Sequence, residues 1–99
     1  MIRHLVGWKL TGETEEARAE GIAAVTEALE SLVGVVPGLL DLTVLPNAAD
    51  IAGNSDLGLI AHYESVDDLR VYVAHPAHQA ALGTVRAHTA DRWAIDYEL

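Results

Sequence analysis

The chain has 99 residues, enough for one domain with a hydrophobic core, and we treat residues 1–99 as a single domain. Its formal net charge is −9, from 15 acidic and 6 basic residues, and it has no Lys/Arg cluster of the kind that binds nucleic acid or anionic membranes. It lacks cysteine, which excludes disulfides and thiolate metal sites, and no apolar run is long enough for a membrane span or signal peptide, so we expect a cytoplasmic protein.

The first third of the chain predicts a strand followed by a helix. Residues 2–10 alternate as in a strand, and one face carries Ile2, His4, Val6, Trp8 and Leu10. His4 is unusual on that face because imidazole prefers water. Apolar residues then recur at helical spacing over residues 14–32, and Thr14 is a suitable N-cap.

The middle of the chain predicts two further strands, over residues 39–45 and 56–63, separated by a loop over residues 46–55. In the first of them, alternation puts one set of residues on one face and the rest on the other: Leu40, Leu42 and Val44 against Leu39, Asp41, Thr43 and Leu45. Both strands carry apolar residues on both faces, which is unusual for a sheet with one face in water.

The last third predicts two helices and a strand. Ser65 caps the first helix, and Pro76 ends it because proline disfavours helical geometry at His75. Pro76 also suits the first position of a second helix, which runs to about His88. Residues 92–99 form the final strand, with Trp93, Ile95, Tyr97 and Leu99 opposite Ala94, Asp96 and Glu98.

The order of elements is βαββαβ, with the second helix broken in two. This order predicts an α+β, ferredoxin-like fold, in which both helices cover one face of a four-stranded antiparallel sheet. Because apolar residues also occupy the other face, we expect a second copy of the chain to cover it. The predicted partner is therefore the chain itself, in a homodimer whose two sheets pack face to face as a dimeric α+β barrel.

Four segments resemble the stress-responsive dimeric A/B barrel (Dabb) family, at matching spacing over essentially the whole chain. They are Ile2-Arg3-His4-Leu5-Val6 with Trp8-Lys9-Leu10, Val36-Pro37-Gly38, the segment from Tyr72 to His78, and Ile95-Asp96-Tyr97. The resemblance implies ferredoxin-like homodimers with a joint barrel. The Tyr-x-x-His-Pro-Ala-His segment and the final Asp-Tyr are also similar to the olivetolic acid cyclase type of polyketide cyclase, which closes a linear polyketide by an intramolecular aldol reaction.

The similarity to these cyclases implies a catalytic role for three residues and no cofactor. His78 would be the general base, Tyr72 would hold the substrate carbonyl, and Asp96 would orient His78. His4, Val6 and His75 are the expected substrate-binding residues. Two departures indicate a different hydrophobic substrate: Leu57 stands where these cyclases have a pocket histidine, and the chain has no phenylalanine to line a tail pocket.

A non-catalytic interpretation remains open beside this one. His78 would then only hydrogen-bond the backbone near Pro76, in a ligand-binding or stress-response domain. His75 is expected to cap a helix end, and Asp96 has His78 or Arg92 as its possible partners. No metal is expected, because His75 and His78 lie on opposite sides of Pro76. His62 and His88, for which spacing indicates no partner, are expected at the surface or an interface.

Overall fold

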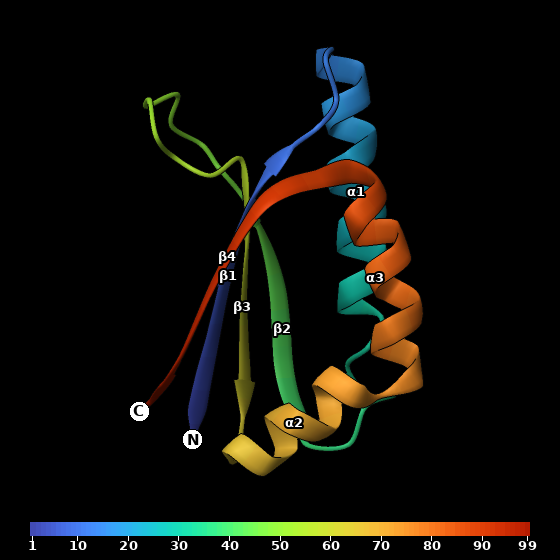
Figure 1. Ribbon diagram of the computed structural model, residues 1–99, viewed down its shortest axis with the longest axis vertical. Coiled ribbons are helices and arrows are strands. Elements are labelled where there is room, and N and C mark those ends of the chain that lie inside the picture. Colours follow the sequence, from blue (N-terminus) through green and yellow to red (C-terminus); the bar gives the residue numbers. More distant parts are fainter.

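A computed structural model describes residues 1–99 and contains seven helices and strands (Figure 1). In chain order these are β1 (Ile2–Leu10), α1 (Glu15–Glu30), β2 (Leu39–Pro46), β3 (Leu57–Tyr63), α2 (Val66–Ala74), α3 (Pro76–His88) and β4 (Thr89–Glu98). The predicted βαββαβ order, with its second helix divided at Pro76, is confirmed. None of the helices is long and apolar enough to cross a membrane.

The four strands form one antiparallel sheet in the order β2-β3-β1-β4. The first strand is therefore central, and Ile2 lies opposite Tyr63 of β3 on one side and Glu98 of β4 on the other. The helices lie together on one side of the sheet (Figure 1). This arrangement is the predicted ferredoxin-like fold.

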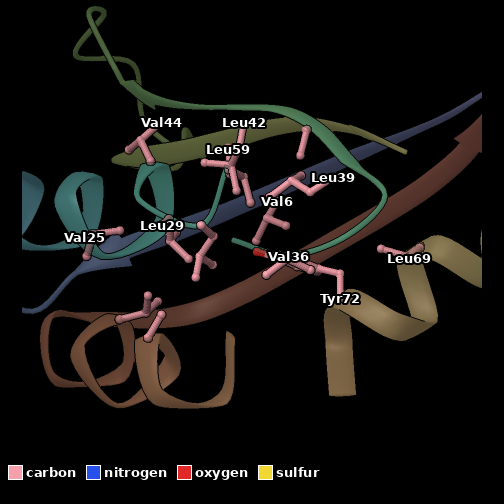
Figure 2. Packing of buried hydrophobic residues seen from close by; sticks show 14 of the residues in the cluster. Val6, Val25, Leu29, Val36, Leu39, Leu42, Val44, Leu59, Leu69 and Tyr72 are labelled. Atoms are coloured by element: carbon pink, nitrogen blue, oxygen red, sulfur yellow. The ribbon is translucent and has the colours of Figure 1, made fainter. Parts of the chain in front are cut away.

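The hydrophobic core lies between this sheet face and the helices (Figure 2). The inner face of β1 contributes Ile2, Val6 and Trp8 to it, as the alternation predicts, and His4 is buried among them. From α1, Val25 and Leu29 are buried against the sheet. Fully burying one such aliphatic side chain stabilises the folded state by about 1.5–3 kcal/mol, so these contacts hold the helices against the sheet.

The predicted facing of β2 is wrong at its first two residues. Leu39 is buried together with Leu42 and Val44, whereas Leu40 is exposed. The cause is a β-bulge: Leu39 and Asp41 lie opposite adjacent residues of β3, which leaves Leu40 as an extra residue. Strict alternation cannot anticipate an inserted residue, and this one shifts the faces of the residues before it.

A second bulge lies near the start of β4, just after the end of α3. The strand begins at Thr89, earlier than predicted, directly after the helix ends at His88. Asp91 has a positive φ of 52°, and Asp91 and Arg92 together occupy the space opposite Trp8 alone. Asp is one of the few residues that tolerates this left-handed conformation. The bulge sets Asp91 and Arg92 apart from the regular ladder.

The outer sheet face carries a row of four polar side chains, one from each strand. His62 Nδ1 lies 2.7 Å from an Asp41 carboxylate oxygen, so His62 has a partner that the sequence did not indicate. Arg3 joins the row by donating to His62 Nε2 at 3.0 Å and to the Tyr97 hydroxyl at 2.8 Å. The same face exposes large apolar side chains that no helix covers: Leu45, Trp93 and Ile95.

Candidate functional site

A cavity of about 440 Å³ opens between the helices and the inner face of the sheet. Its volume is in the usual range for sites that bind small molecules. The apolar lining comes from both layers and includes Val6, Trp8, Leu29, Leu59 and Val85. The polar lining groups that matter for chemistry are His4, Tyr72, His78, Arg86 and Arg92.

The break between α2 and α3 brings Tyr72 and His78 together. Tyr72 lies near the end of α2 and His78 near the start of α3, and their ring centroids are 4.2 Å apart. His75, between the helices, has extended backbone angles, and its Nδ1 accepts a hydrogen bond from the Ala77 N–H at 3.0 Å. That nitrogen caps α3, which confirms the expected capping role of His75, and His75 is not among the residues that line the cavity.

His78 is held by one ring nitrogen and leaves the other unengaged. Its Nδ1 lies 3.1 Å from the Val73 carbonyl oxygen. Since a carbonyl only accepts, Nδ1 carries the proton in the neutral ring and Nε2 is the basic nitrogen. Burial lowers the pKa of His78; the Val73 carbonyl opposes that shift, and the nearby side chains of His4, Arg92 and Arg86 add to it. The imidazole is therefore neutral at pH 7.

Tyr72 offers a neutral hydroxyl beside His78. Burial raises the pKa of Tyr72 to about 12, although the neighbouring Tyr63 hydroxyl and the charge of Arg92 act in the opposite direction. A phenol that stays protonated is a hydrogen-bond donor at every physiological pH.

Tyr63 does not line the cavity but packs against two residues that do. Its ring centroid lies 5.2 Å from that of Tyr72 and 6.2 Å from that of His4. Its hydroxyl is buried and makes no hydrogen bond, and burial raises its pKa. Burial alternates along β3, and Leu59 and Tyr63 both lie on its buried face, so the two-residue period was the available signal.

Asp96 hydrogen-bonds His4 through Nδ1, which corrects both predicted partners, His78 and Arg92. The reason is the strand register: His4 and Asp96 lie directly opposite each other on β1 and β4. Cross-strand neighbours have their Cβ atoms about 4.5–5.5 Å apart, so a carboxylate reaches an imidazole easily. The site thus has two separate histidines, of which Asp96 positions only His4.

Four of the six expected site residues line the cavity: His4, Val6, Tyr72 and His78. Asp96 contacts the cavity only through His4, and His75 faces the helix that it caps. No group of three or more His, Asp or Glu side chains is placed to hold a metal ion.

Comparison with known proteins gives a match over nearly the whole chain. The sequence profile of the Stress responsive A/B Barrel Domain matches residues 2–99. An uncharacterized protein of Streptomyces coelicolor is 33% identical over 99 residues, which cover 99% of each chain.

Solved structures give the same result for the fold. A dimeric ferredoxin-like protein of unknown function from Thermobifida fusca is 30% identical, with a TM-score of 0.80 and coverage of 99% of this chain and 90% of that one. A dimeric protein of Bacteroides fragilis, also of unknown function and ferredoxin-like fold, is 24% identical, with a TM-score of 0.88 and coverage of 99% and 95%.

One structural relative has a stated activity. It is SnoaB, a cofactor-independent oxygenase from Streptomyces nogalater, with 17% identity, a TM-score of 0.78 and coverage of 99% of this chain and 91% of that one. At this identity the likeness shows the shared fold and nothing about the reaction.

Proposed function

Because this chain belongs to the stress-responsive A/B barrel domain family, we propose that it works as a homodimer that binds a hydrophobic carbonyl compound in its cavity and removes a proton beside the carbonyl. One observation carries the proposal: a buried, neutral histidine with a basic Nε2 lies beside a protonated tyrosine in a largely apolar cavity. A base that stays unprotonated at neutral pH and an adjacent hydrogen-bond donor are the two groups that enolisation requires.

In the proposed step, His78 Nε2 takes a proton from the carbon next to the carbonyl. The electron pair of that C–H bond moves into the carbon skeleton, and the negative charge develops on the carbonyl oxygen. The Tyr72 hydroxyl donates a hydrogen bond to this enolate oxygen. A well-placed general base contributes a factor of about 10² to 10⁴ in rate, and one oxyanion donor contributes a similar factor in a dry site.

The enolate then determines the product. In an aldol cyclisation, its carbon forms a bond with a second carbonyl carbon of the same substrate, and the resulting alkoxide takes the proton back from His78. Return of the proton to a different carbon gives an isomerisation instead. Oxygenation is a third outcome, because a carbanion can supply electrons to O₂ without a cofactor, and SnoaB is named a cofactor-independent oxygenase. The proposal is limited to the first step, removal of the proton by His78, which requires no cofactor.

A second candidate function is binding without catalysis. The observation that favours it is the hydrogen bond between His78 Nδ1 and the Val73 carbonyl, which gives the residue a structural task at the helix break. In that case the cavity would hold a hydrophobic ligand, and His78 would serve only to join α2 to α3.

The homodimer is proposed from the outer face of the sheet. Trp93 and Ile95 are 49% and 53% exposed there, and large apolar side chains gathered on one face mark an interaction surface. Two solved relatives with this fold are dimeric. In a face-to-face dimer this surface meets its own copy, while each cavity lies on the opposite side of its sheet.

The test is proton exchange at carbon, measured by NMR in D₂O with ethyl β-ketooctanoate, a β-keto ester with a short alkyl chain. We expect the protein to accelerate deuterium incorporation beside the ketone above the spontaneous rate. His78→Gln should abolish the acceleration, and Tyr72→Phe should reduce it about 100- to 1,000-fold, because one oxyanion donor is lost.

His88→Gln is the matched control, since His88 ends α3 but does not line the cavity. Its exchange rate should equal that of the unaltered protein. Binding of the keto ester without any acceleration, or full acceleration in His78→Gln, would leave ligand binding as the function.

A further inference from the structure

Two arginines stand out because their side chains have no hydrogen-bond partner within the chain. The other four basic side chains all donate hydrogen bonds within the protein: Arg3, Lys9, Arg18 and Arg70. Arg86 and Arg92 make neither a hydrogen bond nor an ion pair, although the chain has 15 acidic residues. A strongly acidic protein thus keeps two guanidinium groups free of its own carboxylates.

Both free arginines lie at the same cavity. Arg86 comes from the last turn of α3 and Arg92 from the bulge of β4, and both line the space that His78 lines. Asp91 is the third charged side chain of this lining and pairs with neither arginine. The three charges sum to +1, in a chain whose net charge is −9.

The positive charge of these arginines is felt inside the cavity. Both contribute to lowering the pKa of His78, after the larger effect of burial, and Arg92 also acts to lower the pKa of Tyr72. Such effects are those of guanidinium charges that lie near the cavity groups. The rest of the lining is chiefly apolar, so the cavity has a cationic region joined to an apolar one.

We propose that the cavity recognises an amphipathic acid, whose carboxylate binds between Arg86 and Arg92 and whose apolar body lies against Val6, Trp8 and Leu59. Guanidinium groups bind carboxylates through paired, charge-assisted hydrogen bonds, which fix orientation as well as adding affinity. The inference rests on the proposed function in using the same cavity, and it predicts that keto acids with a free carboxylate are preferred over uncharged ketones and keto esters. Anchoring that carboxylate would decide which carbon lies beside His78.

Isothermal titration with decanoate and with decanol, the uncharged alcohol of equal chain length, tests the charge preference directly. We expect decanoate to bind about tenfold more tightly, the factor that ~1.4 kcal/mol produces. In the double variant Arg86→Gln/Arg92→Gln this ratio should fall to about one, through loss of decanoate affinity alone. Arg70→Gln, which removes an exposed arginine of α2 that is paired with Asp67, should keep the full ratio.

Equal affinities in the unaltered protein, an unchanged ratio in the double variant, or no binding of either compound would each overturn the inference. If the double variant does not fold, each single variant should show an intermediate ratio of decanoate to decanol affinity. An unchanged ratio in both single variants would also overturn the inference. His78→Gln separates this inference from the proposed catalysis: it should lose proton exchange yet keep the preference for decanoate. If the unaltered protein catalyses proton exchange but binds decanoate and decanol equally, the proposed role of the arginines is wrong and the proposed catalysis stands.

Discussion

The two nitrogens of His78 serve different purposes, so the structural and catalytic interpretations of this residue are compatible. Nδ1 binds the Val73 carbonyl, which fixes the ring at the junction of α2 and α3. That same bond determines the tautomer and leaves Nε2 as the proton acceptor. A catalytic histidine needs a group that holds its second nitrogen, and here a backbone carbonyl takes the place that Asp96 was predicted to fill.

The lowered pKa of His78 predicts how stability depends on pH. Unfolding restores the ordinary value of about 6.5, so below that pH the unfolded chain takes up a proton that the folded chain does not. The contribution of His78 to stability is therefore complete above pH 6.5 and is lost as the pH falls toward the lower folded pKa. Urea unfolding at a series of pH values should show a steeper acid loss for the unaltered protein than for His78→Gln, and parallel curves would contradict the assignment.

The same pKa should govern proton exchange at carbon. Because the folded protein keeps Nε2 unprotonated below the ordinary histidine pKa, the catalysed rate should stay level as the pH falls through about 6.5 and should decline only at more acidic pH. A rate that halves near the ordinary value would indicate a solvated base instead of buried His78.

At the scale of elements, His75 predicts a measurable cap. Its Nδ1 accepts from the Ala77 N–H at the start of α3, and Pro76 occupies the first helical position. His75→Ala should lower the free energy of unfolding by about 1 kcal/mol, the usual cost of losing an N-cap. His75→Asn, which keeps an acceptor, should retain most of the stability. Both variants should bind decanoate normally, since His75 lies outside the cavity; impaired binding would return it to the site.

Much of the secondary structure followed from the sequence because local signals were strong. Thr14 and Ser65 cap their helices as predicted, and Pro76 divides the second helical segment. The two bulges were not predictable, since the chain on either side of Leu40 or Asp91 carries no mark of an inserted residue. Strand order followed from the element order, because few topologies suit βαββαβ.

The site was less predictable than the fold because its contacts depend on register. The partner of Asp96 is decided by which residue of β1 lies opposite it, and that pairing spans 92 positions. The roles of Arg86 and Arg92 depend on the absence of partners, which only three-dimensional placement reveals. Tyr72 and His78 were found because a short segment carries both.

For the whole molecule, the outer sheet face predicts a dimer that one charge can dissociate. Ile95→Glu should give a monomer mass by light scattering at micromolar concentration, because burying an unpaired carboxylate in an apolar interface is costly. Val71→Glu is the matched control: Val71 is 47% exposed, on α2, away from this face, and should remain dimeric. A dimeric Ile95→Glu, or a monomeric unaltered protein, would contradict the proposed interface.

In the proposed dimer the exposed apolar face of the sheet is covered, whereas the cavity lies on the opposite face, so we expect assembly and ligand binding to be separable properties. The Ile95→Glu monomer should therefore still bind decanoate, provided that it stays folded.

The central position of β1 has a consequence for biosynthesis. Strand β1 is synthesised before the other strands of this sheet and pairs with the last of them, as Ile2 lies opposite Glu98. Both edges of β1 are therefore paired only after residues 89–98 have been made. Contacts between such distant positions slow folding, and an unpaired edge promotes aggregation in the meantime. Until β4 is made, the charges available to keep β1 from aggregating are its own Arg3 and Lys9 and the acidic first turn of α1. A nascent chain arrested before β4 should therefore depend on chaperones, whereas the released chain should not.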